Sequence, residues 1–289
     1  MKLNAKYIGN DVIINGLNLC NRSSIHDSIL TYVTNENYVN YIGDNRAVVC
    51  IVLSNKDLEE YQKIKNRDIS FIVSEEPETL FYDIHEYLFF HTDFYEKYDF
   101  KPQIGEKCNI HPNAVIEKGV MIGNNVSIGA NTIVRKGTVI QDNCRIGNNT
   151  IIGSEGFQVI KENGRNRKIV HSGGVLICRD TSIGDNVTIC NSLFENTARI
   201  GKNVMIDNHA YIAHNVIIED NVVITAATVL CGSSTVGREA WIGVNSSVLN
   251  RVAIGDKSKI GIGSVVTRDI PQESLAYGIP AKVKKDYKG

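Results

Sequence analysis

The sequence predicts a mainly β protein in which a long solenoid of short strands follows a small N-terminal α/β domain. The first observation is a period of six. From Ile104 to Ile152 every sixth residue is aliphatic, and the spacing returns at 177–189 and, after a slip by one position, at 200–266. The second is a small or β-branched residue two positions before many of these aliphatic rungs. The third is a different pattern before residue 102, where strand-like and helical stretches alternate.

The six-residue period indicates one short strand and one corner per hexad. Residues i and i−2 of a strand share a face, so the aliphatic residue and the small one point into a narrow interior. Gly, Asp, Asn and Glu cluster between the rungs, where tight corners require short polar side chains or positive φ. The small positions include Ala114, Val126, Thr138, Ala198, Val204, Ala210, Ser234 and Ser258.

Three segments are expected along the chain. Residues 1–101 form the α/β domain, with buried strands at 47–53 and 69–73, each followed by a helical stretch. Residues 102–268 form the repeat domain, which an insertion at 153–175 interrupts, and 269–289 form a C-terminal loop with a basic tail. Loops that break a regular solenoid often sit on its working face.

Composition excludes several classes of protein. The formal net charge is -1, which gives no basic excess for nucleic acid. The apolar run at 47–53 is far too short to span a bilayer, and the N-terminus lacks the apolar core of a signal peptide. Seven cysteines without a CxxC pair indicate neither a disulfide framework nor a zinc knuckle. We therefore expect a cytoplasmic protein without nucleic-acid binding or membrane insertion.

The repeat resembles that of the hexapeptide-repeat acyltransferases. The resemblance implies a left-handed parallel β-helix with three hexads per coil, so the 24 rungs predict about eight coils. Residues 18 apart would then stack about 4.8 Å apart, as neighbouring strands do. It also implies a homotrimer with sites at the subunit interfaces.

Three stretches resemble one branch of that superfamily, the UDP-3-O-acylglucosamine N-acyltransferases of lipid A synthesis and their relatives acting on nucleotide-linked amino sugars. GSEGF at 153–157, followed by a basic loop and SGGVLI, looks like the insertion of that family. IAHNVII at 212–218 looks like its active-site histidine motif. LTYVTNENY at 30–38 resembles its nucleotide-binding segment.

The resemblance assigns nucleotide binding to Tyr32, Asn35 and Tyr38. An aromatic ring offers a flat surface for a base, and an amide can pair its donor and acceptor with a pyrimidine edge. Ordinary packing of half-buried tyrosines is the alternative. Uracil and thymine share the edge that Asn35 would read, so UDP and dTDP sugars both remain candidates.

His214 is the predicted general base, because a neutral imidazole can accept the proton that an amine loses on attacking a thioester. One coil of 18 residues later comes Gly232, whose N–H is the predicted oxyanion donor. One coil earlier comes Asn196, beside Glu195, and either side chain is a candidate for orienting the imidazole. A corner histidine without a chemical task is the alternative.

The acyl donor is predicted from departures from the lipid A enzymes. Arg251 stands where those enzymes carry a second histidine, and the segment from Gly278 through Pro280 to Lys282 looks like the coenzyme A loop of hexapeptide acetyltransferases. We therefore expect acyl-CoA as co-substrate and no bound cofactor. An acyl-carrier-protein-dependent lipid A N-acyltransferase is the alternative.

Two further residues are candidate substrate contacts. His209 either touches the sugar or faces solvent, and Phe157 closes the GSEGF motif of the insertion. Hexapeptide carbonic anhydrases bind zinc with paired histidines, but here the nearest third histidine in the sequence is His171, so no metal site is predicted. A zinc carbonic anhydrase or a non-catalytic scaffold are the remaining alternatives to an N-acyltransferase.

Overall fold

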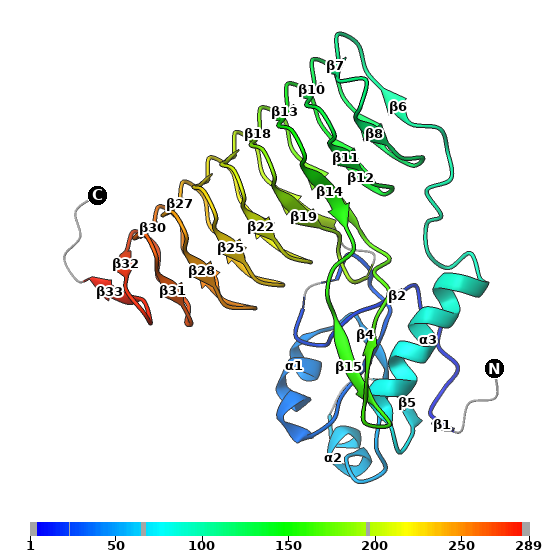
Figure 1. Cartoon of the computed structure of the whole chain (residues 1–289). Helices are drawn as coiled ribbons and strands as arrows, with labels where there is room; N and C mark the ends of the chain where they lie inside the picture. Colours follow the sequence, from blue (N-terminus) through cyan, green and yellow to red (C-terminus); the bar gives the residue numbers. More distant parts are fainter. Residues whose placement is uncertain (1–4, 23, 65–67, 195–196, 285–289) are drawn as a thin grey trace. The chain divides into compact units, whose positions relative to one another are not determined.

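The computed structural model describes residues 5–22, 24–64, 68–194 and 197–284 (Figure 1). It separates into two compact units. The first contains the chain up to Glu96 together with 158–170, and the second contains 97–157 and the chain from His171 onward. The predicted insertion is therefore divided: its middle belongs to the first unit, whereas its two ends remain in the β-helix.

A five-stranded sheet organises the first unit. Its order is β1-β5-β4-β3-β2, with β1 antiparallel to β5 and the other neighbours parallel. The apolar segments predicted at 47–53 and 69–73 form the buried strands β4 and β5, which confirms the α/β class of this domain. The strands are β1 (Lys6–Ile8), β2 (Gly16–Leu17), β3 (Ile29–Tyr32), β4 (Val48–Leu53) and β5 (Ser70–Val73).

Four helical segments follow the strands of this sheet. They are η1 (Glu36–Tyr38), α1 (Val39–Asp44), α2 (Leu58–Gln62) and α3 (Pro77–His91). The longest, α3, begins with Pro77, whose fixed φ and missing N–H suit the first turn of a helix. It buries Leu80, Phe81 and Tyr82 within the unit. The ring centroids of Phe81 and Tyr32 are 4.9 Å apart.

The insertion contributes an antiparallel hairpin to the first unit, formed by β15 (Val159–Glu162) and β16 (Arg165–Lys168). Arg167 fixes the hairpin to α3, because its guanidinium donates to Asp83 at 2.6 Å and to Glu86 at 2.7 Å. The fork geometry of arginine suits such a double contact. Burial lowers the pKa of this guanidinium, but the contacts with Glu86 and Asp83 outweigh that effect and leave the pKa above its usual value.

His85 makes the second attachment of α3 to the insertion. Tyr95 donates its hydroxyl to His85 Nδ1 at 2.7 Å, and His85 Nε2–H donates to the carbonyl of Val170 at 3.0 Å. The imidazole is fully buried, and this desolvation lowers its pKa from 6.5 to about 4. His85 is therefore neutral at physiological pH.

The first unit is expected to lose stability as the pH falls from 6.5 to 4. Over this range His85 takes up a proton in the unfolded chain but not in the folded one, which lowers the free energy of unfolding by up to about 3 kcal/mol. Urea unfolding of wild type and His85→Gln at pH 7.5, 6.5, 5.5 and 4.5 measures this contribution. A constant difference between the two proteins at all four pH values would contradict it.

The second unit is a left-handed parallel β-helix with three faces. The β6 face contains β6 (Gln103–Ile104), β9 (Met121–Ile122), β12 (Thr138–Ile140), β17 (Gly174–Ile177), β20 (Thr197–Ile200), β23 (Ile217–Ile218), β26 (Thr235–Val236) and β29 (Ala253–Ile254). The β7 face contains β7 (Asn109–Ile110), β10 (Ser127–Ile128), β13 (Arg145–Ile146), β18 (Ser182–Ile183), β21 (Met205–Ile206), β24 (Val223–Ile224), β27 (Trp241–Ile242) and β30 (Lys259–Ile260), extended by β32 (Leu275–Tyr277) and β33 (Lys282–Lys284). The β8 face contains β8 (Val115–Ile116), β11 (Ile133–Val134), β14 (Ile151–Ser154), β19 (Thr188–Cys190), β22 (Tyr211–Ile212), β25 (Val229–Leu230), β28 (Ser247–Val248) and β31 (Val265–Val266).

The strand register confirms the predicted coil. Ile128 pairs with Ile146 and Ile212 with Leu230, so paired rungs are 18 residues apart. Eight strands stand on each face before the C-terminal extension, which confirms the eight coils expected from the 24 rungs. Rung side chains such as Ile212, Ile224 and Val248 are fully buried. No helix in the described ranges is long and apolar enough to cross a membrane.

The β-helix is interrupted twice, and both interruptions lie at the β8–β6 corner, where the chain passes from a strand of the β8 face to the next strand of the β6 face. Across the first, Ile151 pairs with Thr188, 37 residues later. Across the second, Thr188 pairs with Tyr211, 23 residues later. The one-position slip of the repeat between Ile189 and Ile200 therefore corresponds to a connection five residues longer than a regular corner. Both extra segments precede the coil of His214.

Candidate active site

His214 lies at the β8–β6 corner of the coil formed by β20, β21 and β22. It follows the rung Ile212 by two positions and is half-buried. Asn215 comes next with φ +59, the left-handed conformation that asparagine tolerates at tight corners. The interior rung thus fixes where the chain turns, and the turn directs the imidazole away from the core.

Asn215 determines which nitrogen of His214 carries the proton. The backbone N–H of Leu193 donates to Asn215 Oδ1 at 3.0 Å, which identifies that side-chain atom as the carbonyl oxygen. The same oxygen lies 3.0 Å from His214 Nδ1. Because a carbonyl oxygen can only accept, Nδ1 carries the hydrogen and Nε2 keeps its lone pair. Nε2 is therefore the nitrogen able to accept a proton.

Gly232 lies against that nitrogen on the next coil. A Cβ built on Gly232 would come within 2.5 Å of His214 Nε2 and 2.7 Å of Cε1, closer than real side chains approach. Only glycine leaves room for the imidazole in this position. The stacking of residue 232 on residue 214, predicted from the 18-residue coil, is thus present in the structure.

The Gly232 N–H differs from several of its counterparts at other corners. At seven of them, the N–H at this position donates to a side-chain carbonyl or carboxylate oxygen of the next coil at 2.6–2.8 Å: Glu106, Asn124, Ala130, Asn148, Asp185, Lys202 and Arg238. Gly232 N–H makes no hydrogen bond with any residue that the structure describes. It is therefore able to donate to a ligand beside His214.

The coil below His214 differs from the sequence prediction. Glu195 and Asn196, the predicted orienting residues, lie outside the described residues. The register that pairs Thr188 with Tyr211 instead sets Asn191 beneath His214, because the longer corner moves the alignment by five positions. Asn215, within the same corner, contacts the imidazole of His214.

His171 is a site residue that the sequence analysis missed as a neighbour of His214. The two ring centroids are 5.4 Å apart with planes at 68°, and His171 is only 5% exposed. Gly156 permits this packing, because an added Cβ would lie 2.3 Å from His171 Nε2 and 2.8 Å from His214 Cβ. The GSEGF motif was the signal in the sequence for this neighbour. It begins the first interruption, and the two ends of that interruption both lie at the β8–β6 corner.

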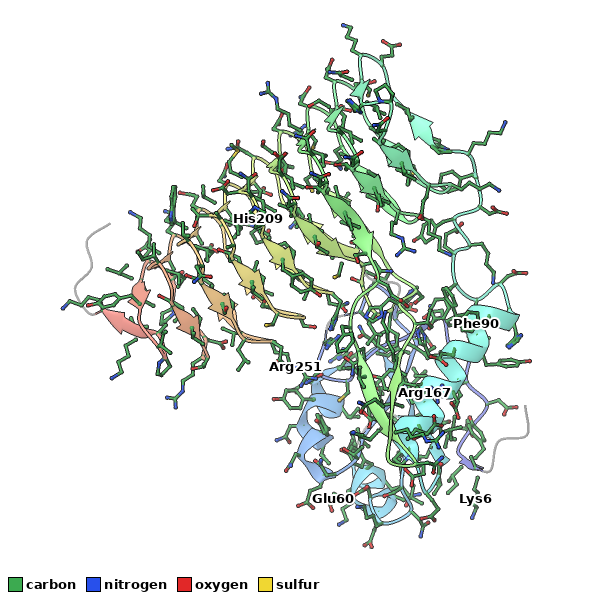
Figure 2. All side chains as sticks on the ribbon, viewed as in Figure 1. Lys6, Glu60, Phe90, Arg167, His209 and Arg251 are labelled. Atoms are coloured by element: carbon green, nitrogen blue, oxygen red, sulfur yellow. The ribbon has the colours of Figure 1, made fainter. Side chains whose placement is uncertain are left out.

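The other histidine of the motif lies elsewhere on the coil. His209 is exposed, has φ +62, and occupies the corner between the β7 and β8 faces, a position filled by asparagine in many coils. Figure 2 shows it on a different edge of the β-helix from Arg251. Among the described residues, no three His, Cys, Asp or Glu side chains come together in a way that could hold a metal ion.

The candidate acyl-carrier residues occupy the C-terminal coils. Arg251 is exposed at the β8–β6 corner, and its N–H donates to the carbonyl of Gly232 at 3.1 Å, so it lies on the coil directly above the glycine. Gly278, Pro280 and Lys282 belong to the hairpin between β32 and β33 and are exposed. Phe157, beside Gly156, is 72% exposed.

The candidate nucleotide residues lie on the segment that leaves β3. The hydroxyl of Tyr32 donates to Glu78 at 2.7 Å and its ring packs on Phe81, so Tyr32 has the contacts of a core residue. Asn35 Oδ1 accepts from Asn37 N–H and caps η1. The ring of Tyr38 is half-buried and lies 6.2 Å from that of Tyr41.

A pocket of about 350 Å³ opens beside this segment at the carboxyl ends of three parallel strands. This edge is where ligands bind in open α/β sheets. Thr34 follows β3, residues 54–56 follow β4, and Glu75 and Pro77 follow β5. Lys56 is exposed at the pocket and is the cation among its lining residues.

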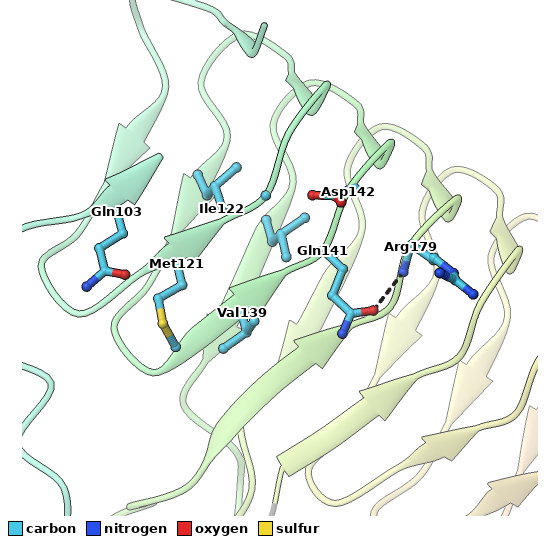
Figure 3. Close-up of a pocket in the computed structure, with 9 residues that line it drawn as sticks. Gln103, Met121, Ile122, Val139, Gln141, Asp142 and Arg179 are labelled. Atoms are coloured by element: carbon cyan, nitrogen blue, oxygen red, sulfur yellow. Dashed lines mark hydrogen bonds between the residues drawn. The ribbon is translucent and has the colours of Figure 1, made fainter. Parts of the chain in front are cut away.

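A second hollow of about 450 Å³ lies on the outer β6 face of the first coils. Figure 3 shows Gln103, Met121 and Val139 on neighbouring strands there. Gln141 Oε1 accepts from the N–H of Arg179 at 3.1 Å at its edge. The lining contains no histidine, cysteine or lysine, so this hollow offers no group suited to act as a base near neutral pH.

Comparisons with known proteins match the β-helix. The sequence profile of the bacterial transferase hexapeptide family, six repeats, matches residues 101–136 and 197–232. That of the hexapeptide repeat of succinyl-transferase matches residues 119–154 and 235–268.

Similar curated proteins are acyltransferases by name. A UDP-3-O-acylglucosamine N-acyltransferase of Campylobacter lari is 30% identical over 137 residues, which cover 47% of this chain and 43% of that protein. The galactoside O-acetyltransferase of Escherichia coli is 30% identical over 114 residues, which cover 36% of this chain and 56% of that protein. The chain thus spans only about half the length of these relatives.

Solved structures agree in fold. The UDP-N-acetylglucosamine acyltransferase from Campylobacter jejuni superposes with a TM-score of 0.57 and 25% identity, covering 63% of this chain and 69% of that one. The enzyme from Bacteroides fragilis gives a TM-score of 0.53 at 21% identity, covering 66% and 71%. The repeat profiles and the coil geometry agree that the second unit is built from hexapeptide repeats like those of bacterial transferases.

Proposed function

We propose that this protein is an N-acyltransferase that moves an acyl group from a thioester carrier to the amine of a UDP- or dTDP-linked amino sugar. The observation that carries the proposal is the corner where Nδ1 of His214 contacts Asn215 Oδ1 and Nε2 faces the glycine Gly232. The names of the curated relatives support the reaction class, and the UDP-3-O-acylglucosamine N-acyltransferase supports the nucleotide-sugar acceptor.

The proposed reaction needs a base, an oxyanion donor and two aligned substrates. The sugar amine attacks the thioester carbon, and His214 Nε2 takes the proton that the nitrogen loses. The carbonyl oxygen becomes negative in the tetrahedral intermediate and accepts from Gly232 N–H. The carbon–sulfur bond then breaks, and the departing thiolate receives the proton from the imidazolium. Amide and free thiol are the products, so atoms and charges balance.

A homotrimer is proposed because two apolar faces flank the β8–β6 corner. Val115 and Ile133 point outward from the β8 face, and Met121 and Val139 from the β6 face. Val115 is 51% exposed, which is unfavourable for an aliphatic side chain unless another surface covers it. Closed three-fold association would cover both faces and enclose His214 between neighbouring subunits.

Lys56 is proposed to bind the nucleotide diphosphate at the pocket beside Thr34. Lys56→Ala is expected to raise the Kd for UDP or dTDP about tenfold, because a charge-assisted contact to phosphate contributes about 1.5–3 kcal/mol. Isothermal titration with each nucleotide measures the change. Lys63→Ala is the matched control, because Lys63 is exposed in the same unit and pairs with Glu60 instead. An equal effect of both substitutions would contradict a specific role.

Acyl-CoA is proposed as the donor, with Arg251 and Lys282 near its phosphates. Arg251 lies two coils above His214, about 10 Å along the β-helix at the usual strand spacing, and Arg268 is exposed at the same corner one coil further. Acyl carrier protein is the second candidate donor, which the resemblance to the lipid A N-acyltransferases implies. A series of acyl-CoA and acyl-carrier-protein donors at equal concentration distinguishes the two.

Thermal shifts with UDP, dTDP, CoA and acetyl-CoA test the proposal before an acceptor sugar is known. A ligand at 100 times its Kd stabilises the folded state by about 2.7 kcal/mol. We expect one nucleotide and one thiol carrier to shift the unfolding midpoint. If no nucleotide and no carrier, including acyl carrier protein, shifts it, the protein is not this enzyme.

A further inference from the structure

His171 packs on His214 from within the first interruption of the β-helix. The ring planes meet at 68°, an edge-to-face arrangement with centroids 5.4 Å apart. Gly156 lies against both imidazoles and leaves no room for a side chain of its own. The two ends of the interruption therefore meet at the imidazole of the proposed base.

Asn191 fixes these two ends. Its Oδ1 accepts from the N–H of Gly156 at 3.3 Å, and its Nδ2 donates to the carbonyls of His171 at 3.3 Å and Gly173 at 3.1 Å. By register this residue lies on the coil directly beneath His214. The side-chain amide of Asn191 thus fixes the backbone position of His171.

The residue before His171 is fixed independently within the first unit. The carbonyl of Val170 accepts from His85 Nε2 at 3.0 Å, and its N–H donates to Glu86 at 3.4 Å. Arg167, which lies three residues before Val170, donates hydrogen bonds to Glu86 and Asp83. The chain therefore reaches His171 directly from a segment held by α3, the helix whose first residue, Pro77, also lines the pocket proposed for the nucleotide.

We propose that His171 is a positioning residue, whose ring holds the imidazole of His214 with Nε2 directed at Gly232. The inference rests on the proposed function, because it assigns His214 the role of base. An imidazole turns readily about its terminal torsion, and the Asn215 contact holds its Nδ1 edge. The His171 ring restricts the remaining rotation by packing.

Two substitutions separate packing from proton transfer. His171→Ala removes the ring and is expected to lower kcat about 30- to 100-fold with KM for both substrates within about twofold, because a misplacement near 1 Å costs about that much. His171→Phe restores a ring without a nitrogen and is expected to recover kcat to within about fivefold of wild type. His209→Asn, at an exposed corner where asparagine is common, is the control and should leave kcat unchanged.

Nitrogen-15 spectra of the His214 imidazole provide a readout that requires no turnover. Wild type and His171→Phe should show the Nδ1–H tautomer, and His171→Ala should show a mixture of tautomers. If His171→Ala leaves both the tautomer and kcat as in wild type, the inference is overturned. Equal loss of activity in both variants with the tautomer kept would make His171 a proton-transfer group instead. If the tautomer changes as expected but no acyl donor is used, the proposed function fails while the positioning role stands.

Discussion

Replacing His214 by alanine is expected to lower kcat/KM for acyl transfer about a thousandfold, the middle of the range for loss of a general base. The side chain is half-buried at a corner, and the rungs of its coil remain in place, so the β-helix should stay folded. The amine would have to lose its proton to solvent instead. Steady-state kinetics with the acceptor and donor identified by thermal shift provide the measurement.

His209→Asn is the matched control for this experiment. It removes a histidine five residues away, at an exposed corner where the left-handed backbone suits asparagine. Wild-type kinetics in the control and loss in His214→Ala would assign the base to position 214. Activity of His214→Ala within a few-fold of wild type would remove this residue from the mechanism, and with it the proposed reaction at this corner.

Gly232→Ala is expected to lower kcat about a hundredfold or more. The new methyl group would lie 2.5 Å from His214 Nε2, so the imidazole must move away from the acceptor amine. The methyl group would also hinder a thioester oxygen from reaching Gly232 N–H, and loss of an oxyanion donor costs about 2.7–4 kcal/mol in other acyl-transfer sites. KM values should change less than kcat, because both contacts matter most in the transition state.

The double variant tests whether the glycine acts through the histidine. In the His214→Ala background the methyl group meets no ring, so any remaining loss from Gly232→Ala reports the oxyanion contact alone. Gly43→Ala, where an added methyl group meets no atom within 4 Å, controls for the glycine-to-alanine change itself. A Gly232→Ala enzyme with wild-type kcat would contradict both roles of the glycine.

The site illustrates how far a periodic sequence predicts geometry. Because the coil has a constant 18-residue length above His214, the position of Gly232 followed from counting, and the structure brings the two together. Counting by 18 failed for the coil before that of His214, because the connection before β20 is five residues longer than a regular corner. Asn191 and His171 were therefore missed as neighbours of His214.

The candidate nucleotide segment shows a different limit. The residues Tyr32, Asn35 and Tyr38 were found by resemblance, but their side-chain contacts depend on α3 and η1. Tyr32 packs on α3, and the pocket opens one residue before Asn35, at Thr34. A short motif identifies a segment, whereas packing against helices elsewhere in the sequence decides which of its side chains face a ligand.

The sequence determined the six-residue period, and its resemblance to the hexapeptide-repeat acyltransferases implied the β-helix, its eight coils and the pairing of His214 with Gly232, because a hexad pattern repeats the same local backbone geometry and fixes each rung against the next. The tertiary structure alone decided the tautomer of His214, the ring of His171 against it, and the division of the insertion between two units. These features depend on irregular segments, whose hydrogen bonds and packing join residues with no fixed spacing along the chain.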